Sequence, residues 1–258
     1  MNESATLKLD LAAGTLSVVV LADSAVEHFR GDFHNRVMFA APLLSAMTLG
    51  SSATARKDSS ANLAHMAAIL GGLAGSSFHV INVMKREGGL SWLNLFYGAP
   101  LGAPLGLTFA GLFGLAADRV RHSRTSPSFA RLLGAAAALG LAGTAIEAAL
   151  LHFRGAFHNK LMYLPVLIPP AAAAMLAKDM IRNRRAKTSV AALRAVVVLG
   201  FGGAVLHTLA VEREMGGWKN WTQNVFAAPP IPAPPAFTAM ALAGLAALEL
   251  MDDGRSAV

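Results

Sequence analysis

A series of long apolar stretches, separated by short charged turns, constrains the fold of this chain more than any other feature. They lie at about 10–28, 38–55, 62–84, 96–117, 130–152, 162–181, 189–211 and 227–250. A helix needs roughly 18 to 20 mainly apolar residues to cross a hydrocarbon core about 30 Å thick. Hydrophobic residues make up 54% of the chain and charged residues 14%. The sequence therefore predicts an all-α integral membrane protein with about eight transmembrane helices.

The first stretch has the general form of a secretion signal, since Lys8 precedes an apolar run from Leu11 to Ala22. Asp23 and Glu27 also interrupt its end. We expect this stretch to be retained as a span, because the segment that follows it belongs to an internal repeat.

The repeat joins residues 28–39 to residues 152–163, which follow 124 positions later and are identical at eight of twelve positions. The same offset aligns Asp23 with Glu147. A looser match aligns His79 and the residues after it with His207 and the residues after it. We therefore expect two tandem halves, 1–125 and 126–258, each of two helical hairpins. An even number of spans per half gives the halves parallel topology around an axis along the membrane normal.

The distribution of basic residues predicts the orientation. Fourteen of the 22 Lys and Arg residues lie at the termini or in loops on the same side as the termini. The three tryptophans, Trp92, Trp218 and Trp221, lie on the other side, where an interfacial aromatic belt is expected. Both termini are then cytoplasmic, and the repeated loops face outward from a bacterial inner membrane. The net charge of +7 does not predict nucleic-acid binding, because the basic residues lie in short loops between spans.

Six of the eight histidines lie in the outward loops or at the helix ends that lead into them: His28, His34, His79, His152, His158 and His207. Imidazole and carboxylate groups suit iron, copper or zinc in a chain without cysteine. His28, His79, His152 and His207 each end an odd-numbered span. Together they predict one metal site, or axial pairs for haem b, in a redox or metal-handling protein. His34 and His158 are secondary candidates for metal ligands.

Charged residues near the outward end of the first and fifth spans are candidates for supporting roles. Asp23 and Glu147 are expected to accept hydrogen bonds from the imidazole N–H groups, and Glu27 accompanies them. An ion pair of Arg30 or Arg154 with the acid of the same copy is the alternative, because an ionisable group inside a span normally needs a partner.

Other interpretations remain open. The four helix-terminal histidines also suit helix capping, and the outward prolines suit hairpin shaping. A transporter or channel using Asp23 and Glu147 for protons or cations is a rival function. So is a structural or assembly subunit that docks other membrane-complex subunits or a periplasmic partner. The sequence shows no phosphate-binding loop or hydrolase triad, so neither enzyme activity nor catalytic residues are assigned. His65 and His122 are expected to have no functional role.

Overall fold

The computed structural model describes residues 2–54, 59–123 and 125–256. All regular structure in these ranges is helical. The long helices are α1 (Glu3–Arg30), α2 (Ala40–Thr54), α3 (Ser59–Met84), α5 (Leu105–His122), α6 (Pro127–Arg154), α7 (Leu164–Arg182), α8 (Lys187–Arg213) and α10 (Pro235–Ser256). The short ones are η1 (Arg36–Phe39), α4 (Trp92–Tyr97), η2 (Lys160–Tyr163), η3 (Gly217–Asn220) and α9 (Trp221–Ala227).

Seven helices in the described ranges are long and apolar enough to cross a membrane, which supports the prediction of an all-α, multi-pass membrane protein. The predicted eighth span is not confirmed. It corresponds to α5, which has 18 residues and carries Asp118, Arg119 and Arg121 in its last turns. A helix of that length is about 27 Å long.

Two predicted spans begin later than expected because prolines interrupt them. The stretch expected from residue 96 forms the end of α4 and an irregular segment, and α5 starts at Leu105, directly after Pro104. The stretch expected from residue 227 remains irregular until α10 starts at Pro235. Proline lacks an N–H donor and is best tolerated in a first helical turn, so these prolines delay the start of α5 and α10. In α7, by contrast, Pro169 and Pro170 lie inside the helix.

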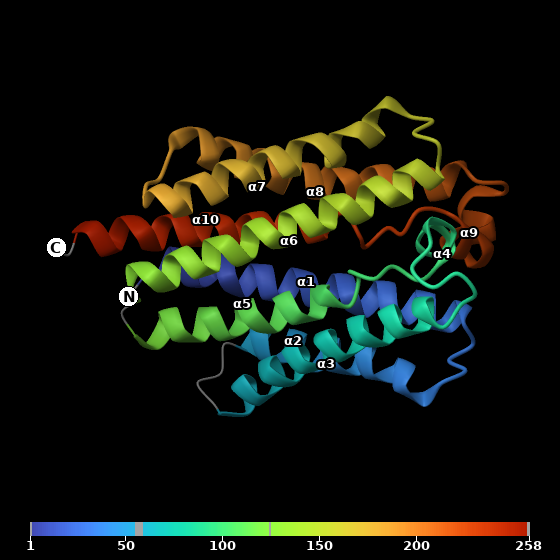
Figure 1. The fold of residues 1–258 in the computed structure, drawn as a ribbon, viewed down its shortest axis with the longest axis horizontal. Helices are drawn as coiled ribbons and strands as arrows, with labels where there is room; N and C mark the ends of the chain where they lie inside the picture. The colour runs from blue at the N-terminus through green and yellow to red at the C-terminus, as the bar shows by residue number, and fades with distance from the viewer. Residues whose placement is uncertain (1, 55–58, 124, 257–258) are drawn as a thin grey trace.

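α1 and α10 lie side by side at the centre of the bundle (Figure 1). α1 also packs against α2 and α5, whereas α10 packs against α6 and α8. In α10, 72% of the apolar window is buried, more than in any of the other six candidate spans. Both termini lie at one end of the bundle, and α4 and α9 lie at the other. We call the second of these the α4/α9 end.

Small residues allow the closest helix contacts. A Cβ at Gly72 of α3 would lie 2.3 Å from Thr108 Oγ1 of α5, and a Cβ at Gly200 of α8 would lie 2.2 Å from Thr238 Oγ1 of α10. Each threonine hydroxyl donates a hydrogen bond to a backbone carbonyl of the facing helix, at 3.2 Å and 2.9 Å respectively. Close approach through glycine, with a hydroxyl bond between helices, is typical of packing in membranes.

Helix boundaries in the first part of the chain correspond to those in the second. α1 and α6 each have 28 residues and begin and end 124 positions apart. η1 and η2 have the same offset. The repeated segments of the sequence therefore occupy corresponding places on their helices.

Candidate functional site

The repeated segment forms the same chain reversal in both copies. After α1, Asp32 and Phe33 adopt positive φ angles of 57° and 41°, and the Phe33 N–H donates to the carbonyl of His28 at 3.0 Å. After α6, Ala156 and Phe157 adopt 55° and 45°, with the same 3.0 Å bond to His152. An asparagine then caps the following 3-10 helix. The segment reverses the chain and brings it back beside the histidine.

Each of the four helix-terminal histidines is tied through Nδ1 to a backbone carbonyl further along the chain. The four contacts are His28 with Met38 at 2.6 Å, His79 with Pro100 at 2.7 Å, His152 with Met162 at 2.8 Å and His207 with Pro230 at 2.7 Å. A carbonyl oxygen only accepts, so Nδ1 carries the proton in each case. The Nε2 atom of the neutral ring then has a free lone pair. No hydrogen bond to these Nε2 atoms occurs among the described residues.

Convergence of the histidines on one metal is not observed. In the ranges that the structure describes, no group of three or more His, Asp or Glu side chains is placed to hold a metal ion. His152 and His207 are close enough to interact electrostatically. His34 and His158 are exposed, and their Nδ1 atoms contact the carbonyls of Gly31 and Gly155 in their own turns, both at 2.9 Å.

Asp23 and Glu147 do not accept hydrogen bonds from Nδ1 of these histidines, because backbone carbonyls accept those bonds. Glu147 lies beside the irregular segment after α4, where a Cβ at Gly102 would be 3.4 Å from its Oε2 atom. It is within electrostatic range of Asp23 and Arg154. Its Oε1 atom is buried and has no partner. Asp23 lines a hollow of about 330 Å³, which includes open space, with Glu27 and residues of the 225–232 segment.

The two arginines bond differently from one another. Arg30 pairs with Glu27 at 2.8 Å on the exposed surface, rather than with Asp23. Arg154 donates to the carbonyls of Leu95 and Gly98 at 3.1 Å and 3.4 Å. The expected ion pair of each arginine with the acid at position 23 or 147 does not form within 4 Å.

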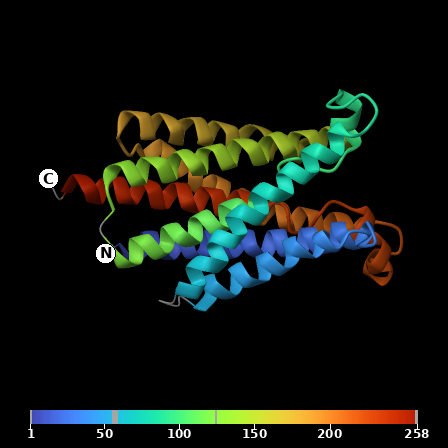
Figure 2. The same cartoon turned by 60° about the horizontal axis from the view of Figure 1, so that its bottom comes forward.

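The ends of α1 and α6 each pack against a short helix from the other part of the chain. Phe153 of α6 contacts Phe96 and Trp92 of α4. Phe29 of α1 stacks on Phe226 of α9, with ring centroids 5.4 Å apart. Figure 2 shows α4 beside the end of α6 and α9 beside the end of α1. Asp23 and Glu147 thus lie where the two parts of the chain cross.

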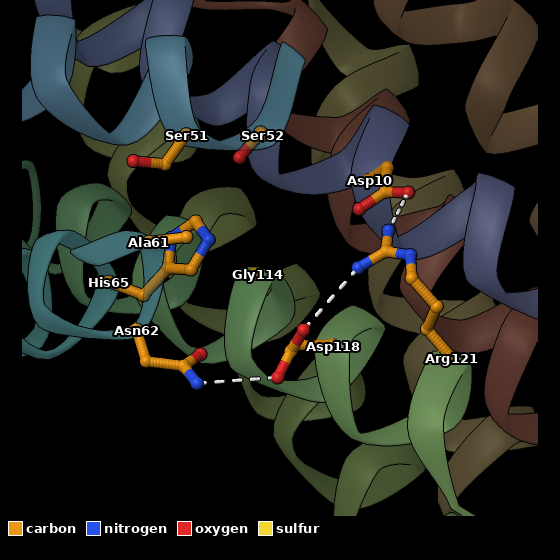
Figure 3. A pocket seen from close by; sticks show the side chains of 9 residues that line it. All are labelled: Asp10, Ser51, Ser52, Ala61, Asn62, His65, Gly114, Asp118 and Arg121. Atoms are coloured by element: carbon orange, nitrogen blue, oxygen red, sulfur yellow. Dashed lines mark hydrogen bonds and ion pairs between the residues drawn. The ribbon is translucent and has the colours of Figure 1, made fainter. Parts of the chain in front are cut away.

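A second polar site, which sequence reasoning missed, lies at the end that holds the termini. It is lined by Asp10 of α1, Ser51 and Ser52 of α2, Ala61, Asn62 and His65 of α3, and Gly114, Asp118 and Arg121 of α5 (Figure 3). The sequence did contain a signal for it, because most of these polar residues align with apolar residues in the second half.

Buried side-chain atoms without a hydrogen-bond partner fall into two groups along the bundle. Ser24 Oγ, Ser76 Oγ, Glu147 Oε1 and Arg154 Nε lie toward the α4/α9 end, and Ser52 Oγ, Asn62 Oδ1 and His65 Nδ1 lie in the second polar site. Buried polar atoms are normally satisfied by protein, water or an ion, so both groups are candidates for ligand contact. No protein-family model, curated protein or solved structure matches this chain, so its function is inferred from geometry.

Proposed function

We propose that this membrane protein moves protons or small cations, and that Asp23 and Glu147 are the groups that bind them. The observation behind this proposal is the position of the two carboxylates. They come from different parts of the chain, lie within electrostatic range of each other, and include the unpartnered Oε1 atom of Glu147.

The physical argument starts from the cost of a carboxylate inside a membrane. An ionisable side chain at the centre of a span costs roughly 2.5 to 3.5 kcal/mol on insertion scales, so it normally faces a partner or a water-filled path. Neither acid has an ion-pair partner within 4 Å among the described residues. A proton or small cation between the two carboxylates offsets their mutual repulsion, which makes the pair suited to transient binding.

The proposed architecture is two tandem halves around an axis along the membrane normal, with eight spans including α5, cytoplasmic termini and an outward α4/α9 end. The equal lengths of α1 and α6 support this arrangement. So do the paired histidine contacts and the reciprocal packing of Phe29 and Phe153. In such an arrangement Asp23 and Glu147 lie near the axis, where a path between the halves is expected.

Flux measurements in proteoliposomes test the proposal. We expect wild-type protein to dissipate an imposed gradient of protons, or of Na⁺ or K⁺, and Asp23→Asn/Glu147→Gln to lose that activity. Glu87→Gln is the matched control, because Glu87 is an exposed acid at the same end of the bundle. Equal flux in wild type and the double variant, or no flux above empty liposomes for any of these ions, would rule the proposal out.

A second candidate function is binding of a transition metal (Cu, Fe or Zn) or haem b in a redox or metal-handling role. The fixed tautomer of His28, His79, His152 and His207 favours it, because a metal-ligating histidine usually donates its other N–H to a carbonyl or carboxylate. With no three-ligand group in the described ranges, binding would use imidazole pairs, as in axial haem ligation.

Metal analysis and an absorption spectrum of protein purified in mild detergent test this second function. Stoichiometric metal or a Soret band that His152→Ala/His207→Ala loses, and that the exposed His122→Ala retains, would support it. A colourless, metal-free wild type would exclude it. Protein with neither flux nor metal would point to the assembly role, in complex with other membrane subunits or a periplasmic partner.

A further inference from the structure

The second polar site is enclosed by four helices at the end of the bundle that holds both termini. α1, α2, α3 and α5 each contribute side chains to it, and Figure 3 shows them directed toward a common space. Its interior has room for about one water molecule. The site lies at the opposite end of α1 from Asp23.

The formal charges of the residues in the site do not sum to zero. Arg121 contacts Asp10 at 2.5 Å and Asp118 at 3.6 Å, so one guanidinium serves two carboxylates. Asp118 also accepts a hydrogen bond from Asn62 at 3.3 Å and lies 3.1 Å from Nδ1 of the exposed His122. With both histidines neutral, these three charged groups leave one net negative charge.

His65 is the residue of the site that most lacks a partner. His65 is only 4% exposed, and its Nδ1 atom makes no hydrogen bond. Ser52 Oγ and Asn62 Oδ1 are also buried without partners. The ring rests on Gly114, where an added Cβ would lie 2.3 Å from the imidazole. A glycine is thus required at this position for the histidine to fit.

Packing does not require these polar side chains, as the corresponding site in the second part of the chain demonstrates. Gly244 corresponds to Gly114 at the offset of α5 and α10, and it is flanked by Leu193 and Leu176, which correspond to His65 and Ser52. The remaining counterparts of the site's charged residues are Gly134, Leu248 and Met251. All three leucines and Met251 are buried in the hydrophobic core.

One polar residue remains at the corresponding site. Ser189, the counterpart of Ala61, donates a hydrogen bond to the carbonyl of Met175 at 3.5 Å and so is satisfied by its own neighbours. The same helix geometry therefore holds with an almost wholly apolar interior. Packing alone does not account for the imidazole, the two carboxylates and the three unpartnered atoms, which only the first of the two sites has.

We propose that this site binds a single water molecule and that His65 exchanges a proton with the solution through it. A buried water needs two to four polar partners, and His65 Nδ1, Ser52 Oγ and Asn62 Oδ1 are the atoms without one. In the exchange, a proton passes from a hydronium at the water position to an imidazole nitrogen, which leaves water and an imidazolium. The added positive charge cancels the excess negative charge of Asp10, Asp118 and Arg121.

Nuclear magnetic resonance of ¹⁵N-histidine-labelled protein in lipid nanodiscs tests the proposal, with the His65 signal assigned by its loss in His65→Leu. We expect the ring signal to move from neutral to imidazolium positions as the pH is lowered, and to show a cross-peak to water. The signal of the exposed His122, assigned by its loss in His122→Ala, is the comparison for a histidine at the surface. A His65 ring that stays in one neutral tautomer at every pH at which the protein remains folded, without a water cross-peak, would overturn the proposal.

A second variant separates ligand binding from a structural role. Asn62→Val/His65→Leu copies Val190 and Leu193 of the corresponding site. It keeps the ion pairs of Arg121 with Asp10 and Asp118 but removes the hydrogen bond from Asn62 to Asp118. We expect its melting temperature to equal or exceed that of wild type, with one fewer proton taken up per chain in a pH-jump dye assay. Unchanged proton uptake would refute the exchange. This result is independent of flux through Asp23 and Glu147, so either proposal can fail without the other.

Discussion

Phe153 of α6 packs edge-to-face against Phe96 of α4, with ring centroids 5.8 Å apart and an interplanar angle of 86°. The contact joins residues 57 positions apart that belong to different parts of the chain. Its counterpart joins Phe29 of α1 to Phe226 of α9. The ends of α1 and α6 are therefore each anchored by packing against a short helix from the other part of the chain.

A double-mutant cycle on Phe96→Ala and Phe153→Ala measures the strength of this anchor. Aromatic pairs contribute about 0.5 to 1.5 kcal/mol beyond burial of area, so we expect a coupling energy in that range from thermal unfolding in detergent. Leu132→Ala, at a position 71% exposed on the same helix, should show no coupling to Phe96→Ala. Additive effects of the two phenylalanine substitutions would mean that the rings do not anchor the helix.

Loss of a helix-terminal imidazole should loosen the chain reversal that it holds. His152→Ala removes the bond to the Met162 carbonyl and should lower the free energy of unfolding by about 1 kcal/mol. His28→Ala should do the same through Met38. His158→Ala is the control, since His158 is exposed and bonds only within its turn. Equal melting temperatures for His152→Ala and His158→Ala would contradict this prediction.

The contact of α8 with α10 should not tolerate a methyl group at Gly200. An alanine there would place Cβ 2.2 Å from Thr238 Oγ1 and 2.9 Å from the Thr238 backbone nitrogen. Overpacking of this kind costs about 1 to 3 kcal/mol, and the loss should appear as a lower melting temperature. Gly202→Ala provides a matched control two residues away, because nothing lies within 4 Å of a Cβ at Gly202. A stable Gly200→Ala variant would disprove the close approach.

Backbone strain in the second chain reversal should be relieved by glycine. Ala156 has a φ of 55°, a conformation that costs L residues roughly 1 to 2 kcal/mol. Ala156→Gly should therefore raise thermal stability by up to about 1 kcal/mol, after the entropy of glycine is included. Ala174→Gly, at an exposed position inside α7, should lower it by about the same amount. If both variants are destabilised, Ala156 is not left-handed in the folded protein.

Hydropathy was sufficient to predict the class of the fold and the approximate place of most helices, because apolar length decides whether a helix can cross a bilayer. Predicted and observed helices agree closely for α3, α6, α7 and α8, although α7 contains Pro169 and Pro170. They disagree before α5 and α10. There the apolar run continues through prolines that lie outside the helices, so hydropathy predicted longer spans than the backbone forms.

The repeat led the sequence analysis to residues that the structure places toward the α4/α9 end, but not to their hydrogen-bond partners. Nothing in the spacing indicates that His152 donates to the Met162 carbonyl, because that bond depends on two consecutive positive φ angles at Ala156 and Phe157. The sequence predicts no functional role for His65. Its neighbours come from three other helices, and that proximity is a property of the packing.

The reciprocal aromatic anchors imply that the molecule should survive being made as two polypeptides. Fragments divided between α5 and α6 would each present a phenylalanine and a short helix that the other fragment completes, and α1 would still pair with α10. We expect separately expressed fragments to reassemble in the bilayer when they are produced together, and either fragment alone to be degraded. A gene encoding only one such fragment would then be expected to act as a paired dimer with a second copy or a sister chain.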